Sequence, residues 1–149
     1  MVKCRRMTTN KVDRGVDSET APAKQGPRPV HRILVVDDES DIRAINVGIL
    51  THHGYKVDSV EDGAAAWEAL DADGYDLLIT DNQMPKVSGV ELLRKLHSAR
   101  KAIPVIMATG ILPGDEFARE PWLQPLAVLL KPYTGAELVE TVAQVLRQI

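Results

Sequence analysis

The chain has a single cysteine and no long apolar run. Cys4 has no second cysteine with which to form an intramolecular disulfide, and a cysteine-based metal site would lack its other ligands. No apolar stretch approaches the roughly 20 residues that a membrane-spanning helix needs. The N-terminus also lacks the apolar core of a secretory signal. We therefore expect a cytoplasmic protein with no membrane partner.

Several catalytic motifs are also missing. The histidines show no metal-ligand spacing, which argues against a zinc site. Ser88-Gly89 lacks the G-x-S-x-G pattern of a hydrolase, and Gly110 with Gly114 forms no phosphate-cradling loop. A Walker motif and a dinucleotide-binding fingerprint are absent too. These absences argue against a serine hydrolase, a P-loop NTPase and a nicotinamide-dependent enzyme.

The charge is distributed unevenly along the 149 residues. Residues 1–32 hold eight Lys or Arg against three acids, and residues 33–149 hold ten against eighteen, so the two parts carry +5 and −8. Residues 1–30 show no hydrophobic period and end in a proline-rich stretch, which predicts a disordered basic tail before one domain over 31–149. An acidic domain repels phosphate backbones, so we expect no direct DNA binding.

From residue 32 onward, short apolar runs alternate with helical patterns, which is typical of an α/β domain with a parallel sheet. Most of the runs are apolar throughout, as strands covered by helices on both faces are. Capping boxes at Ser88 and Thr134 mark two helix starts. The expected strands are 33–36, 56–60, 76–80, 104–109 and 126–130, and the expected helices are 39–53, 63–72, 89–100, 115–120 and 135–148.

Polar side chains follow or end four of the predicted strands. They are Asp37 and Asp38, Asp81, Thr109 and Lys131. The carboxyl ends of parallel strands form the ligand-binding edge of such a sheet, so these groups are expected to converge. Three carboxylates held close together repel one another, and a divalent cation offsets this repulsion. Oxygen ligands favour Mg²⁺.

A purely structural interpretation of the same acids remains open. Asp37 or Asp38 could cap the helix that begins near Glu39, and Asp81 could open a turn before Met84-Pro85. Either interpretation is reasonable for one residue alone. To explain all five strand-end residues in this way, a separate structural role would be needed for each of them at once. We therefore favour a common site.

The segments ILVVDDE, LLITDNQMP, VIMATG and LLKPY, in this order and spacing, resemble the receiver domains of bacterial two-component systems. The resemblance covers about residues 31–149 and implies a flavodoxin-like, doubly wound sheet of five parallel strands in the order 2-1-3-4-5. It implies that Asp81 is the phosphoacceptor. Asp38, Asp81 and the backbone carbonyl of Gln83 would bind Mg²⁺ directly, with Asp37 acting mainly through a water. Lys131 and Thr109 would contact the phosphoryl group, and Lys131-Pro132 would be a cis peptide.

The resemblance also implies the partners. A sensor histidine kinase or a phosphotransfer protein would donate the phosphoryl group from a phosphohistidine, and Gln83 and Ile111 would influence its hydrolysis. The signal would pass by contact to a further protein, because only 18 residues follow Lys131. One departure concerns the switch: family members usually have Tyr or Phe where this chain has Val128, and Tyr133 matches a different, structural aromatic position.

Two other functions compete with this interpretation. A haloacid-dehalogenase-like phosphatase also uses an aspartate and magnesium at strand ends, but its D-x-D-x-T or D-x-D-x-V pattern is absent around Asp37 and Asp38. We therefore expect no enzyme beyond the domain's own phosphotransfer and dephosphorylation. A receiver-like module that binds partners without phosphorylation is the second alternative. The presence of all five expected site residues argues against it.

Overall fold

The computed structural model describes residues 29–149, in which five short strands alternate with helices. In chain order the elements are β2 (Arg32–Val36), α1 (Ser40–His52), β3 (Lys56–Val60), α2 (Gly63–Ala72), β4 (Leu77–Thr80), α3 (Gly89–Ser98), β5 (Val105–Thr109), α4 (Gly114–Arg119), a 3₁₀ turn η1 (Pro121–Leu123), β6 (Ala127–Leu130) and α5 (Gly135–Arg147). The sequence predicts a disordered tail over residues 1–30, and residues 1–28 of it lie outside the described residues.

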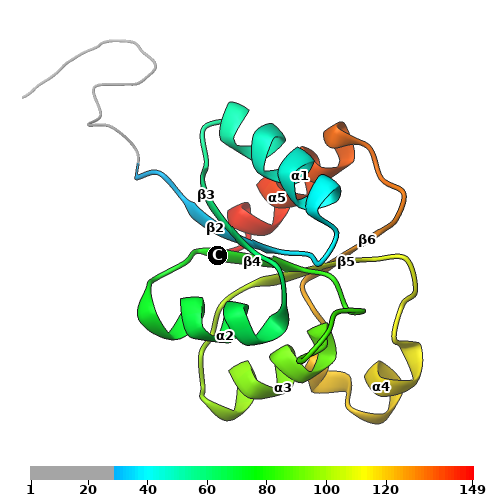
Figure 1. The fold of residues 1–149 in the computed structure, drawn as a ribbon. Coiled ribbons are helices and arrows are strands. Elements are labelled where there is room, and N and C mark those ends of the chain that lie inside the picture. Colours follow the sequence, from blue (N-terminus) through cyan, green and yellow to red (C-terminus); the bar gives the residue numbers. More distant parts are fainter. Residues whose placement is uncertain (1–28) are drawn as a thin grey trace, which may run out of the picture.

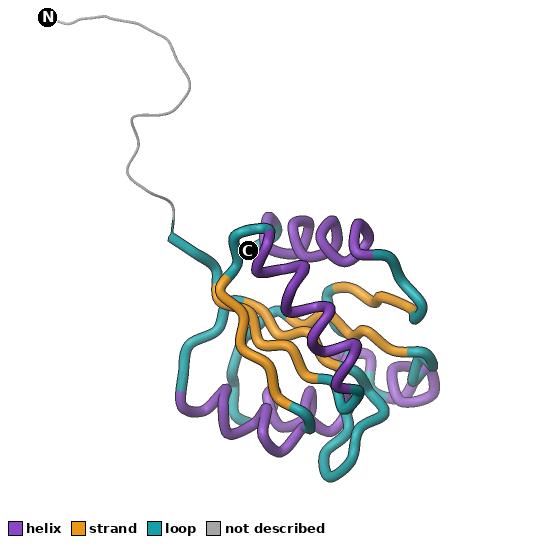
Figure 2. Tube along the Cα trace, turned by 45° about the horizontal axis from the view of Figure 1, so that its top comes forward, coloured by secondary structure: helices purple, strands orange, loops and turns teal. Residues whose placement is uncertain are grey.

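The strands form one parallel sheet in the order β3-β2-β4-β5-β6, which is the predicted order 2-1-3-4-5. Figure 1 shows α1 and α5 on one face of the sheet and α2, α3 and α4 on the other. In Figure 2 the strands lie between these two helical layers. The sequence prediction of a doubly wound α/β sheet is therefore confirmed.

Two apolar cores fill the space between the sheet and its helical layers. Alternate residues of a strand point to opposite faces, so Leu34 and Val36 pack towards α2 and α3, whereas Ile33 and Val35 pack towards α1 and α5. All four of these side chains are at most 1% exposed. The central strands are buried on both faces, which is why their sequences are continuously apolar.

Local chemistry fixes the helix starts. Ser88 and Thr134 each accept a hydrogen bond from the backbone N–H three residues on, and Glu91 and Glu137 bond back, so both predicted capping boxes are present. The segment after β5 is less regular. α4 has six residues and ends before Pro121, whose ring cannot continue an α-helix, and η1 follows. The predicted bounds 56–60 and 63–72 match the structure, and the others differ from it by at most two residues at either end.

The edge strand β6 and the residue before it carry exposed apolar side chains. Leu126, Val128 and Leu130 are 52%, 39% and 58% exposed, because the short α4 does not extend over them, while Leu129 between them is buried. No helix among residues 29–149 is long and apolar enough to cross a membrane.

Candidate functional site

The strand register brings the predicted site residues to one edge of the sheet. Val36 pairs with Thr80, so Asp37 and Asp81, which follow them, leave neighbouring strands side by side. Thr109 pairs with Leu130, and Lys131 follows directly. The N–H of Asp81 donates to the carbonyl of Val36 at 3.1 Å, which extends the pairing into the site. The expected convergence of these residues is present.

The carboxylate of Asp81 is held at both oxygens. Its Oδ1 accepts hydrogen bonds from the backbone N–H groups of Asn82 at 2.6 Å and Gln83 at 3.3 Å. Its Oδ2 accepts one from Lys131 Nζ at 2.9 Å. Asp81 is only 6% exposed, and with both oxygens hydrogen-bonded its side chain has a fixed orientation. Asp81 therefore does open a turn, as the structural interpretation predicted. The same turn also directs its carboxylate towards the ammonium group of Lys131.

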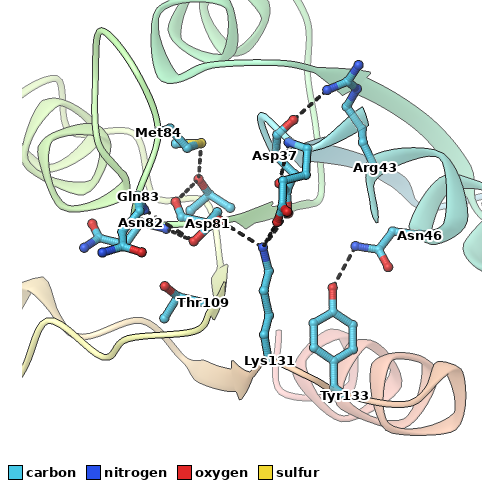
Figure 3. A network of polar contacts seen from close by, with 12 residues as sticks. Asp37, Arg43, Asn46, Asp81, Asn82, Gln83, Met84, Thr109, Lys131 and Tyr133 are labelled. Carbon is cyan, nitrogen blue, oxygen red and sulfur yellow. Dashed lines mark hydrogen bonds and ion pairs between the residues drawn. The ribbon is translucent and has the colours of Figure 1, made fainter. Parts of the chain in front are cut away.

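Lys131 lies between two acidic strand ends (Figure 3). Its Nζ is 2.9 Å from Asp37 Oδ2 and 2.9 Å from Asp81 Oδ2, and 3.4 Å from Glu39 Oε1. Burial alone lowers the pKa of Lys131, but the hydrogen bonds and negative charges of Asp81 and Asp37 outweigh it, and the net pKa is raised. Lys131 therefore stays protonated at neutral pH.

Asp37 shows the cost of burying these acids. It is 2% exposed, and burial raises its pKa above the ordinary value, although the N–H of Glu39 and the ammonium of Lys131 partly offset this. The raised pKa means that Lys131 alone does not fully compensate the buried charge of Asp37. A further cation would do so.

The acids meet a geometric requirement for such a cation. One carboxylate oxygen from each of Asp37, Asp38 and Asp81 lies within 4.8 Å of the other two, with Asp38 on the exposed side. Oxygen atoms at this spacing from two strand ends suit Mg²⁺, which takes one or two protein carboxylates and keeps several waters. Asp38 forms no ion pair among residues 29–149, so its carboxylate is available. The residues therefore fit this ion.

A cradle of backbone contacts positions the loop after β4, and the sequence analysis did not predict it. Asn82 Oδ1 accepts from the N–H of Val90, and its carbonyl accepts from the N–H of Gly89. A Cβ at Gly89 would collide with the backbone oxygen of Asp81. On the opposite side, Arg43 Nη1 donates to the carbonyl of Asp37 at 2.7 Å. In the sequence, the only sign of this arrangement of the loop after β4 is the glycine eight residues after Asp81.

Thr109 is fully buried at the end of β5, and its hydroxyl is engaged locally. Its Oγ1 lies 3.2 Å from the carbonyl of Ile111, to which it donates, and accepts weakly from the N–H of the same residue at 3.4 Å. Ile111 and Gln83 both line an open hollow of about 430 Å³ beside the site. The two residues expected to influence hydrolysis thus face one hollow.

Tyr133 and Val128 are the two positions that correspond to aromatic residues of receiver domains. Tyr133 is half-buried, and its hydroxyl accepts a hydrogen bond from the buried Asn46 at 2.8 Å, so it has the structural role expected for it. Val128 is 39% exposed on β6 and supplies no aromatic ring. The peptide bond Lys131-Pro132 is cis, as the resemblance implies.

Comparisons with known proteins agree with this geometry. The model of the response regulator receiver domain matches residues 33–143. The chain is similar to the response regulator RppA of Synechocystis sp., with 38% identity over 112 residues, covering 72% of this chain and 47% of RppA. It is also similar to the response regulator receiver protein CpdR of Brucella abortus, with 31% identity over 120 residues, covering 77% of this chain and 96% of CpdR.

A solved structure has a similar fold. The response regulator protein TrrA of Thermotoga maritima, solved in complex with Mg²⁺ and BeF, aligns with a TM-score of 0.68 and 30% identity, covering 78% of this chain and 99% of TrrA. The chain spans about half the length of RppA but nearly all of CpdR. With its strand order, its strand-end acids and the match over residues 33–143, the chain belongs to the family of response regulator receiver domains of two-component systems.

Proposed function

We propose that the domain over residues 31–149 accepts a phosphoryl group on Asp81 from a phosphohistidine of a sensor histidine kinase or phosphotransfer protein. One observation carries this proposal: Asp81 Oδ2 lies 2.9 Å from Lys131 Nζ within a cluster of three carboxylates suited to Mg²⁺. A nucleophilic carboxylate, a fixed cation and a metal site are the parts that phosphoryl transfer to aspartate requires.

Phosphoryl transfer from the donor's imidazole to Asp81 needs no further substrate. An oxygen of Asp81 attacks the phosphorus, the bond between phosphorus and the donor's imidazole nitrogen breaks, and the electron pair stays on that nitrogen. Lys131 neutralises charge on the transferring oxygens, and Asn82 and Gln83 hold the carboxylate through their N–H groups. Bound Mg²⁺ would supply further charge neutralisation there. Asp37, Asp38, Asp81 and the Gln83 carbonyl would hold it.

The product is an acyl phosphate, which hydrolyses readily, so the signal is transient. Water reaches it through the hollow that Gln83 and Ile111 line. The domain's catalysis is limited to its own phosphorylation and dephosphorylation. It takes part in signalling in the cytoplasm rather than turning over a metabolite.

The output is proposed to pass by contact to another protein, without direct DNA binding by this domain. Phosphorylation would draw Thr109 away from Ile111 and towards the phosphoryl oxygens, which shifts the population of the α4, β6 and α5 face. Val128 cannot supply the aromatic rotation usual in the family, so the shift would involve the backbone after Thr109. The exposed apolar side chains of β6 offer a contact surface on that face.

A receiver-like module that acts without phosphorylation is the alternative, and binding of a phosphoryl mimic separates the two. Beryllofluoride with Mg²⁺ is titrated calorimetrically into the wild type and into Asp81→Asn. The proposal predicts one site in the wild type that requires Mg²⁺ and no binding to the variant. Absence of wild-type binding, or equal binding by the folded variant, favours the alternative.

A further inference from the structure

Helices α1 and α5 lie side by side on one face of the sheet (Figure 1). Side chains from both helices line an open groove. The groove has a volume of about 710 Å³. Ile49 and His53 line it from α1 and its C-cap, and Val139, Ala143 and their neighbours line it from α5. A Cβ at Gly135 would lie 3.1 Å from Ile49 Cδ1, so the two helices are closely packed at this end of the groove.

The α5 side of the groove is one face of the helix. Ala136, Val139, Glu140, Ala143 and Arg147 recur at helical spacing, which places them on a single stripe. The core uses another side of α5, formed by Leu138, Val142, Val145 and Leu146. The fold therefore leaves the stripe, apolar along its middle and charged at Glu140 and Arg147, without a partner from the described part of the chain.

The two charges on this stripe are free to pair with another molecule. Glu140 accepts a single long hydrogen bond, from Gln144 at 3.4 Å, and Arg147 forms no ion pair within residues 29–149. They lie about two helical turns apart, with Ala143 near the midpoint. This pattern is self-complementary under a two-fold axis that passes close to Ala143.

We propose that the groove binds α5 of a second copy of this chain, which forms a symmetric dimer with the two α5 helices antiparallel. Glu140 then faces Arg147 of the partner subunit, and the symmetry repeats the pair. The small side chain of Ala143 lies at the crossing point and allows the helices to approach closely. Ile49 and Val139 supply apolar contact on each side of it. Such an isologous interface closes at two subunits.

The dimer does not depend on phosphoryl transfer, because none of its contacts uses Asp81 or a group that holds it. Sedimentation velocity of the full chain, measured over a range of concentrations without phosphodonor, tests it. Glu140→Arg and Arg147→Glu each place like charges opposite one another twice, so each is expected to weaken dimerisation by roughly tenfold or more. The double variant Glu140→Arg/Arg147→Glu restores the pairing in reverse and is expected to return to about the wild-type constant.

Mixing the two single variants gives a second, independent readout. In the mixture, a Glu140→Arg copy carries arginine at both positions of the stripe, and an Arg147→Glu copy carries glutamate at both. The two variants are therefore expected to form a heterodimer, although neither dimerises well alone.

Glu68→Arg on α2 reverses a charge on the opposite face of the sheet and serves as the control, with circular dichroism to check the fold of every variant. This control is expected to dimerise as the wild type does. A monomeric wild type at every concentration, or a dimer that both single reversals leave unchanged, would overturn the proposal.

Discussion

Lys131 Nζ lies 2.9 Å from Asp37 Oδ2, although 94 positions separate the two residues in the chain. The contact joins the carboxyl end of the first strand to that of the last, with Asp81 between them at the same distance from Nζ. The ammonium group thus balances part of the negative charge of the carboxylate cluster. The remaining imbalance at Asp37 leads to the first prediction.

Asp37→Asn is expected to raise the melting temperature of the metal-free protein at pH 7. Burial raises the pKa of Asp37, so the folded state holds a proton more tightly than the unfolded state does. Stability therefore falls as pH rises from the ordinary Asp pKa of about 4 through the raised value, and the penalty is largest above that value. The gain from the variant should shrink towards zero below that window.

Thermal unfolding in EDTA between acidic and neutral pH measures this effect. Asp41→Asn, at an exposed position in the first turn of α1, removes a nearby charge without removing a buried one. A lower melting temperature for Asp37→Asn than for wild type at pH 7 would show that the ion pair with Lys131 outweighs the cost of burial.

Asp38→Asn is expected to remove most of the stabilisation that Mg²⁺ gives, while leaving the metal-free protein nearly unchanged. Asp38 is the exposed member of the carboxylate cluster and forms no ion pair among the described residues. A ligand at about 100 times its Kd stabilises the folded state by about 2.7 kcal/mol. Melting temperatures across a Mg²⁺ titration measure the difference, with Asp73→Asn at the opposite edge of the sheet as control. Equal shifts in wild type and Asp38→Asn would exclude Asp38 as a ligand.

Gly89→Ala and Gly48→Ala are expected to have opposite effects on stability. A Cβ at Gly89 would collide with the backbone oxygen of Asp81, so this variant should lose stability and also bind Mg²⁺ more weakly. Gly48 has open space around it within α1, where alanine is favoured over glycine by about 0.5–1 kcal/mol. Urea unfolding and calorimetric Mg²⁺ titration of both variants measure these changes. Unchanged Mg²⁺ affinity in a folded Gly89→Ala protein would show that the cradle does not position the site.

Thr109→Ala is expected to bind beryllofluoride while losing the response of the loop after β5. In the structure the Thr109 hydroxyl contacts both backbone groups of Ile111, so its movement towards a phosphoryl group must change the environment of the Ile111 amide. The ¹H–¹⁵N resonance of Ile111 should shift with beryllofluoride in wild type and shift much less in the variant. A full shift of that amide in Thr109→Ala would place the switch elsewhere.

Short-range signals in the sequence predict most of the fold and part of the site. Continuous apolar runs identified the buried strands, and the capping boxes at Ser88 and Thr134 identified two helix starts because each pairs groups only three residues apart. Asp37, Asp81 and Lys131 were recognisable because polar groups directly follow apolar strands.

The rest depends on packing that no local pattern encodes. Arg43 reaches the Asp37 carbonyl from six residues away on α1, and the collision that makes Gly89 necessary joins the two ends of the loop between β4 and α3. Both depend on the paths that the loops take in the folded domain, which no motif in the sequence marks. The uncovered β6 likewise results from a short α4, whose end at Arg119 is set by Pro121 but whose position over the sheet is set by tertiary contacts.

Intact mass measurement after incubation with acetyl phosphate tests the central claim most directly. With Mg²⁺ the wild type is expected to gain the mass of one phosphoryl group, and this gain should disappear with EDTA and in Asp81→Asn. Lys131→Gln should reduce the gain, because the cation beside Asp81 Oδ2 is lost. No adduct on the folded wild type, or an adduct that persists in Asp81→Asn, would contradict phosphorylation at Asp81.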